Sequence, residues 1–132
     1  MNYVYNKLVR DKIPEEINSE KGRHCNYRIL NDEEYSQELD KKLFEEAHEF
    51  IEEHNPKELA DLMEVIFNIA SFYKISMENV ENLRLNKNYK KGSFKNRIYL
   101  IDVNEEKRNY AEEKELNKEW RRNPKDYLTN IN

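Results

Sequence analysis

Two neighbouring stretches decide the fold of this chain: KLFEEAHEFI (residues 42–51) and ELADLMEVI (residues 58–66). In and around the first stretch, residues that would share one helical face recur every three or four positions: Leu39, Leu43, Ala47, Phe50 and His54. This spacing predicts a long amphipathic helix over about 33–54, which Asn31 or Asp32 can cap. Asn55-Pro56 then restarts the chain, because proline is favoured at the first position of a helix. A second helix is therefore expected from Pro56 to about Tyr73.

Four acidic residues stand in these two otherwise apolar helices, at the spacing Glu-x-x-Glu and then Glu-x-x-Asp: Glu46, Glu49, Glu58 and Asp61. At about 100° per residue, Glu46 borders the apolar stripe of its helix and Glu49 flanks it. A carboxylate turned towards a helical core is costly unless a positive charge meets it, and neither helix is expected to place a base there. A hard divalent cation such as Mg²⁺ resolves this conflict.

The second helix carries the stronger signal. Glu58 projects from an apolar arc, and only the sector that holds Glu64 and Asn68 is expected to face solvent. A helix that is apolar nearly all round is predicted to be buried, so its acids need a partner.

Two alternatives to a metal site remain open. Glutamates on a chain with 38% charged residues are commonly solvated, which suffices for Glu45, Glu52, Glu53 and Glu64. Glu58 also follows Asn55 by three positions, where a reciprocal capping interaction would use its side chain. Cap and ligand are equally acceptable for Glu58 alone. As a quartet on consecutive, antiparallel helices, the acids favour a metal site.

The flanks of the hairpin are predicted in less detail. Pro14 begins a brief helix that ends near Lys21–Gly22, and residues 24–30 are expected to form a short strand. Ser76 caps a third helix from Met77 to about Lys91, which Gly92 ends. A further exposed helix is expected around residues 105–122.

Composition bounds the class of protein. With 132 residues the chain is expected to form one domain, and only 2 Gly and 3 Pro argue against a turn-dense β fold. Cys25 is alone, which excludes a disulfide framework, and no stretch approaches the roughly 18 apolar residues of a membrane span. The sequence opens without the apolar run of a signal peptide, so a cytoplasmic protein is expected, with no membrane partner.

Charge is unevenly distributed along the chain. Residues 32–64 hold thirteen acids against three bases, whereas residues 87–97 hold five bases and no acid. A negative centre beside a positive flank suits a metal ion with a polyphosphate, and it does not suit duplex nucleic acid.

The acidic pattern resembles the signature of the MazG-like all-α nucleoside triphosphate pyrophosphatases, which phosphoribosyl-ATP pyrophosphohydrolases and dimeric dUTPases share. YNKLVRDKIPE (residues 5–15) is similar to the opening of the branch called phosphoribosyl-ATP pyrophosphohydrolase-like. KGSFKNRIYL (residues 91–100) resembles the Gly-Gly-Phe segment of that branch, with Ser93 in place of the second glycine. The resemblance covers residues 3–101 and predicts a domain over residues 1–101. Residues 102–132 fall outside it, and their Glu/Lys-rich composition predicts a charged helical tail.

That resemblance implies an all-α helical bundle with a short extended N-terminal segment. It makes Glu46, Glu49, Glu58 and Asp61 ligands of Mg²⁺, with Mn²⁺ as a substitute. The implied reaction is attack of metal-activated water between the α and β phosphates, which gives a nucleoside monophosphate and pyrophosphate. Glu45, Glu46 and Glu49 are the implied catalytic residues, with Glu45 a candidate base despite its outward angle.

The implied substrates are aberrant or surplus nucleoside triphosphates, and the implied assembly is a homodimer or homotetramer. Basic residues expected to contact the phosphates are Arg10, Lys12, Lys91, Lys95 and Arg97. For the last three, a solvated helix end has equal weight, and Asp11 is an alternative partner of Arg10. Two other functions stay open: phosphoribosyl-ATP hydrolysis, and a non-catalytic helical module that binds a nucleotide or a protein.

Overall fold

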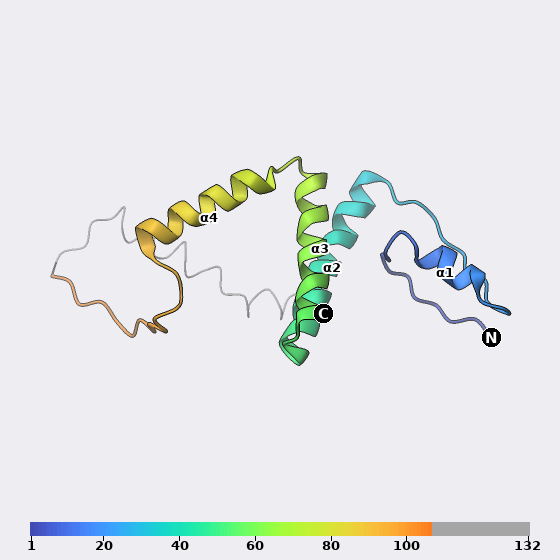
Figure 1. Cartoon of the computed structure of the whole chain (residues 1–132), viewed down its shortest axis with the longest axis horizontal. Coiled ribbons are helices and arrows are strands. Elements are labelled where there is room, and N and C mark those ends of the chain that lie inside the picture. Colours follow the sequence, from blue (N-terminus) through green and yellow to red (C-terminus); the bar gives the residue numbers. More distant parts are fainter. Residues whose placement is uncertain (107–132) are drawn as a thin grey trace. The chain divides into compact units, whose positions relative to one another are not determined.

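The computed structural model describes residues 1–106, and every regular element in that range is a helix. They are α1 (Ile13–Ser19), α2 (Asp32–Glu53), α3 (Pro56–Phe72) and α4 (Met77–Lys91) (Figure 1). The predicted all-α class is thereby confirmed for the described residues, with helix ends within a few positions of those expected. None of these helices is long and apolar enough to cross a membrane.

The chain divides into two compact units, Met1–Asn86 and Lys87–Asn132. The predicted boundary at residue 101 rests on the family resemblance and stays a prediction. The helix expected over about 105–122 lies outside the described residues, except for its first two positions.

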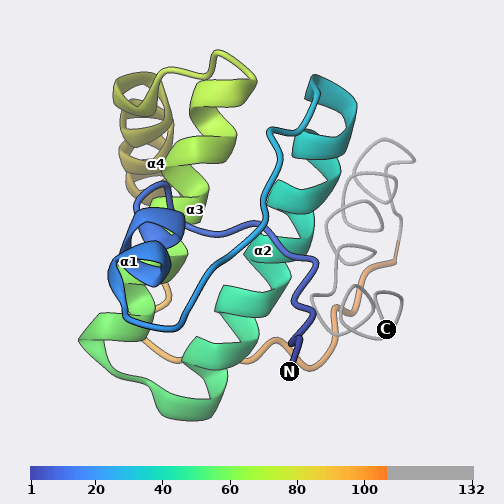
Figure 2. The same ribbon diagram turned by 90° about the vertical axis from the view of Figure 1, so that its right-hand side faces the viewer.

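The first unit is organised around an antiparallel hairpin of α2 and α3, which lie side by side in both views (Figures 1 and 2). Tyr35, early in α2, packs edge to face on Phe72 at the end of α3, with ring centroids 5.5 Å apart. Between the ends of the hairpin, Leu39, Val65 and Ala70 are only 3–8% exposed. They are the sole buried apolar side chains in residues 1–106, so this core is small.

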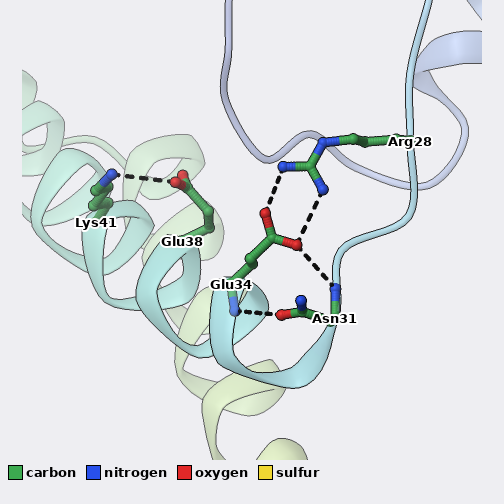
Figure 3. A network of polar contacts seen from close by, with 5 residues as sticks. All are labelled: Arg28, Asn31, Glu34, Glu38 and Lys41. Atoms are coloured by element: carbon green, nitrogen blue, oxygen red, sulfur yellow. Dashed lines mark hydrogen bonds and ion pairs between the residues drawn. The ribbon is translucent and has the colours of Figure 1, made fainter.

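Hydrogen bonds fix the start of α2, as the sequence predicts. Asn31 Oδ1 accepts the Glu34 backbone N–H at 2.9 Å, and the Glu34 carboxylate accepts the Asn31 N–H in return (Figure 3). Arg28 donates to both oxygens of Glu34, and this hydrogen bonding lowers the pKa of Glu34. The segment before α2 is thus tied to the first turn of the helix, where negative charge is favoured.

The strand predicted over residues 24–30 is wrong, because these residues are neither helix nor strand. A strand needs a neighbour to complete its backbone hydrogen bonds, and residues 1–106 contain no strand. The Cys25 N–H instead donates to Asn18 Oδ1 at 3.0 Å. Helix α1 also ends before the predicted Lys21–Gly22.

Both ends of the α3–α4 connection have recognisable caps. Ile75 N–H donates to Ala70 O at 2.8 Å and Lys74 N–H to Ser71 O at 3.2 Å, which is a Schellman motif. Lys74 occupies its left-handed position with φ 56°. Ser76 Oγ then accepts the Asn79 N–H at 3.2 Å, which confirms the predicted cap of α4.

The apolar face of α3 is wider than α2 can cover. Its outer residues are each between 41% and 49% exposed: Leu59, Met63, Ile66 and Phe67. The prediction that only the Glu64 sector faces solvent is therefore wrong within the described chain. One packing helix covers one face, and among the helices of residues 1–106 only α2 is in extensive contact with α3.

Candidate metal centre

Three of the four predicted ligands converge where α2 and α3 approach the hairpin turn. Glu46 comes from α2, and Glu58 and Asp61 come from α3, where a spacing of three places them on one side of the helix. One carboxylate oxygen from each lies within 4.8 Å of the other two. Ligand oxygens around Mg²⁺ lie about 3–4 Å apart, so a modest contraction of these side chains would enclose an ion.

Two oxygens of this acidic cluster (Glu46, Glu58 and Asp61) lack a hydrogen-bond partner. Glu46 is only 8% exposed, and its Oε2 is buried and unpaired, as is Oε2 of Glu58. Leaving a buried acceptor unsatisfied costs about 1–3 kcal/mol, and more when the group is charged. A cation between the two helices would supply the missing partner, so the donor set fits a hard divalent ion.

Helix capping does not account for Glu58. Asn55 Oδ1 accepts the Glu58 backbone N–H at 2.9 Å, so Asn55 caps α3 as predicted. The Glu58 carboxylate does not return the interaction to Asn55, in contrast with Glu34 at the start of α2. Its side chain is therefore left for another role.

Burial and neighbouring acids raise the pKa values of two carboxyl groups of the cluster. Burial raises the pKa of Glu46, the charge of Glu49 adds to the rise, and Lys42 opposes it. Burial likewise raises the pKa of Glu58, followed by the charges of Glu49 and Asp61. The net direction is upward for both carboxyl groups, so desolvation and like charge outweigh the neighbouring lysines.

Glu49, the fourth predicted ligand, lies at the edge of this group. It is exposed and does not belong to the set of oxygens within 4.8 Å of one another. It is nevertheless close enough for its charge to raise the pKa of both Glu46 and Glu58. Its role as a ligand stays a prediction.

Bases lie closer to the cluster than the sequence analysis expects. Lys42 Nζ is 3.7 Å from Glu46 Oε1 and 3.4 Å from Glu45 Oε2. The prediction that neither helix places a base near these acids is therefore wrong. The reason is local, because Lys42 precedes Glu46 by four positions and so shares its face. Lys42 forms an ion pair with Glu46 Oε1, whereas Glu46 Oε2 stays unpaired.

Two more bases reach the acids from the N-terminal segment. Arg10 Nη2 lies 2.9 Å from Asp61 Oδ1, and Lys7 Nζ lies 3.7 Å from Glu45 Oε1. Arg10 pairs with Asp61 rather than with the alternative Asp11. Glu45 is half-buried and forms ion pairs with Lys7 and Lys42, and its role as a base stays a prediction.

The other predicted phosphate contacts are Lys12 and three residues of the second unit. Lys12 makes no hydrogen bond or ion pair with the cluster in the described structure and instead lines a surface depression with Glu15, Glu16 and Ser19. The remaining three are exposed residues of the second unit, and their role stays a prediction: Lys91, Lys95 and Arg97.

Sequence reasoning missed Lys7 and Lys42. The spacing of Lys42 from Glu45 and Glu46 could have revealed it, whereas nothing local in the sequence links Lys7 to a residue 38 positions further on.

The class of site is therefore a candidate divalent-cation centre, built from carboxylates on an α-helical hairpin. Comparisons with protein-family models, curated proteins and solved structures gave no match for this chain. A functional assignment consequently depends on the chemistry of the cluster and on the pattern of residues around it.

Proposed function

We propose that this protein is a Mg²⁺-dependent nucleoside triphosphate pyrophosphohydrolase of the MazG-like superfamily. It would convert a nucleoside triphosphate and water into a nucleoside monophosphate and pyrophosphate. The expected substrates are aberrant or surplus nucleotides, and the expected setting is the cytoplasm.

One observation carries the proposal. Glu46 and Glu58, on different helices, each hold a buried carboxylate oxygen without a partner, beside Asp61. Such an arrangement is unfavourable by itself and becomes favourable around a cation. Mg²⁺ in proteins is characteristically held by a few carboxylates and by substrate phosphates. The spacing of these acids is also the one that resembles the superfamily signature.

The residues in and around the cluster would have two roles, metal binding and activation of water. Glu46, Glu58 and Asp61 would hold the ion, with Glu49 joining from the solvent side. When bound, a divalent ion neutralises charge on the phosphates and lowers the pKa of bound water. Glu45 would accept a proton or orient the attacking water, since Lys7 and Lys42 fix its carboxylate beside the cluster.

A homodimer would explain the exposed face of α3. The four apolar residues of that face (Leu59, Met63, Ile66 and Phe67) are about half exposed, while the described core has only three buried apolar side chains. An unpaired apolar face on so small a core favours association, and the same face on a second copy matches it in character. We therefore propose that two α2–α3 hairpins pack together through α3.

The direct test is pyrophosphate release from a panel of common, deoxy, modified and phosphoribosyl nucleotides, with Mg²⁺ or with a chelator. We expect Mg²⁺-dependent release, and a loss of about 10²-fold or more in Glu46→Gln and Glu49→Gln, because removing a ligand forfeits several kcal/mol of transition-state stabilisation. Glu64→Gln is the matched control, because Glu64 is an exposed acid on α3 outside the cluster.

The outcome across the panel separates the alternatives. Release from phosphoribosyl-ATP alone would identify the biosynthetic reaction instead. No release from any nucleotide with Mg²⁺ or Mn²⁺ would overturn the enzymatic proposal and favour a helical module that only binds.

A further inference from the structure

The N-terminal segment (residues 1–12) is held to the hairpin mainly by charge. It contains no helix or strand and runs across α2 on its way to α1 (Figure 2). Tyr3, Val4 and Tyr5 are 68–72% exposed, so they provide little apolar anchoring. Within residues 1–106, its ion pairs with the hairpin are those of Lys7 with Glu45 and of Arg10 with Asp61, and Leu8 is half-buried.

Arg10 forms an ion pair with Asp61, one of the acids that a cation would need. Its Nη2 donates to Asp61 Oδ1 at 2.9 Å, and Asp61 is one of the three carboxylates of the cluster. A guanidinium hydrogen-bonded to a metal ligand would stand only about 4–5 Å from the ion, where two positive charges repel.

We infer that Arg10 and the divalent cation bind Asp61 in exchange. Without the ion, Arg10 neutralises Asp61 and anchors the N-terminal segment. Ion binding releases Arg10 and loosens the segment, while the ion pair of Lys7 with Glu45 keeps the segment beside the hairpin. The freed guanidinium is then available to a phosphate at the same site. This inference rests on the proposed cation site, but it concerns which group of the chain the ion displaces.

The exchange is physically accessible because the ion pair is weak. The side chains of Arg10 and Asp61 are 59% and 31% exposed, and exposed pairs of this kind contribute little. A divalent ion that gains three carboxylates would outcompete one guanidinium. A segment with few buried apolar contacts also opens at low cost.

Two measurements on the full chain test the exchange without reference to activity. The first is the backbone NMR order parameters of residues 1–12, with and without Mg²⁺. The second is calorimetric titration of Mg²⁺ into the wild type, Arg10→Gln and the control Arg23→Gln. The control also removes one arginine charge, from an ion pair with Glu20.

We expect Mg²⁺ to lower the order parameters of the segment in the wild type, and Arg10→Gln to show low order parameters already without metal. Arg10→Gln should bind Mg²⁺ up to about fivefold more tightly, because no guanidinium has to leave Asp61. Arg23→Gln should match the wild type.

Unchanged or higher order parameters in the segment on adding Mg²⁺, or unchanged or weaker binding in Arg10→Gln, would overturn the inference and leave the cation site intact. Absence of any Mg²⁺ binding to the wild type would instead remove the site on which both proposals depend.

Discussion

Glu46 on α2 and Glu58 on α3 face each other across the hairpin with carboxylate oxygens within 4.8 Å, and each residue keeps one oxygen buried and unpaired. Two acids on neighbouring helices thus weaken the interface that they occupy, unless a cation joins them. The folded protein should therefore be more stable when either charge is removed or when a metal is added.

Neutralising Glu46 should stabilise the metal-free protein. Glu46→Gln removes like-charge repulsion and part of the desolvation cost, so we expect a gain on the order of 1 kcal/mol, or about 4 °C in Tm. Thermal unfolding with a chelator measures the gain. With Mg²⁺ present, the wild type should rise in Tm and Glu46→Gln should respond far less. A lower Tm for Glu46→Gln with chelator would contradict this explanation of the unpaired oxygens.

The stability of the metal-free protein should fall as the pH rises above the ordinary glutamate value. Burial and neighbouring acids raise the pKa of Glu46 and Glu58 in the folded state above their usual 4.5. Between the ordinary and the raised pKa, the folded protein binds more protons than the unfolded chain, so stability declines with pH. The loss is complete above the raised pKa.

Urea unfolding over about pH 4.5 to 8 measures this effect, with Glu46→Gln as the reference. Glu34 and Glu81 have lowered pKa values because of hydrogen bonds from Arg28 and Arg84, so their contributions are already present throughout that range. The difference between wild type and Glu46→Gln should grow with pH in the absence of metal and shrink with Mg²⁺. Parallel curves without metal would show that Glu46 carries no such stress.

Lys74 offers a test of the fold that does not involve the site. It occupies the left-handed position of the Schellman motif that ends α3, with φ 56°, where glycine is the favoured residue. Lys74→Gly should stabilise the protein by about 1 kcal/mol in urea or thermal unfolding. Lys87→Gly, in the interior of α4, is the contrasting control and should destabilise. Equal or lower stability of Lys74→Gly would show that the end of α3 is not formed as described.

The exposed face of α3 should control the oligomeric state. Phe67→Glu places a charge within the apolar face and should shift a wild-type dimer to monomer in sedimentation or light scattering. Glu64→Lys changes charge on an exposed position of the same helix and should leave the dimer intact. A monomeric wild type at all concentrations, or a dimer that survives Phe67→Glu, would contradict association through α3.

Local sequence patterns predict the helices well and the site in part. The break at Asn55-Pro56 and the caps at Asn31 and Ser76 are short-range features, so the helix ends follow from neighbouring residues. The facing of Glu46 towards Glu58 and Asp61 also follows from helical periodicity in a hairpin.

Contacts between distant parts of the chain were beyond such patterns. The pairing of Arg10 with Asp61 spans 51 positions, and no periodicity specifies it. The strand expected over residues 24–30 failed for the same reason, because a strand depends on a partner that the local sequence does not show. The apolar residues on the outer face of α3 predict that this face is buried. The sequence does not show how many helices cover it.

Mn²⁺ titration followed by electron paramagnetic resonance would show whether the hairpin acids bind one divalent cation. The wild type and Glu64→Gln should remove free Mn²⁺ signal at a saturable site, in competition with Mg²⁺. Glu46→Gln, Glu58→Gln and Asp61→Asn should each lose most of that binding. Equal Mn²⁺ binding in all five proteins, or no binding in the wild type, would rule out a cation site formed by these acids.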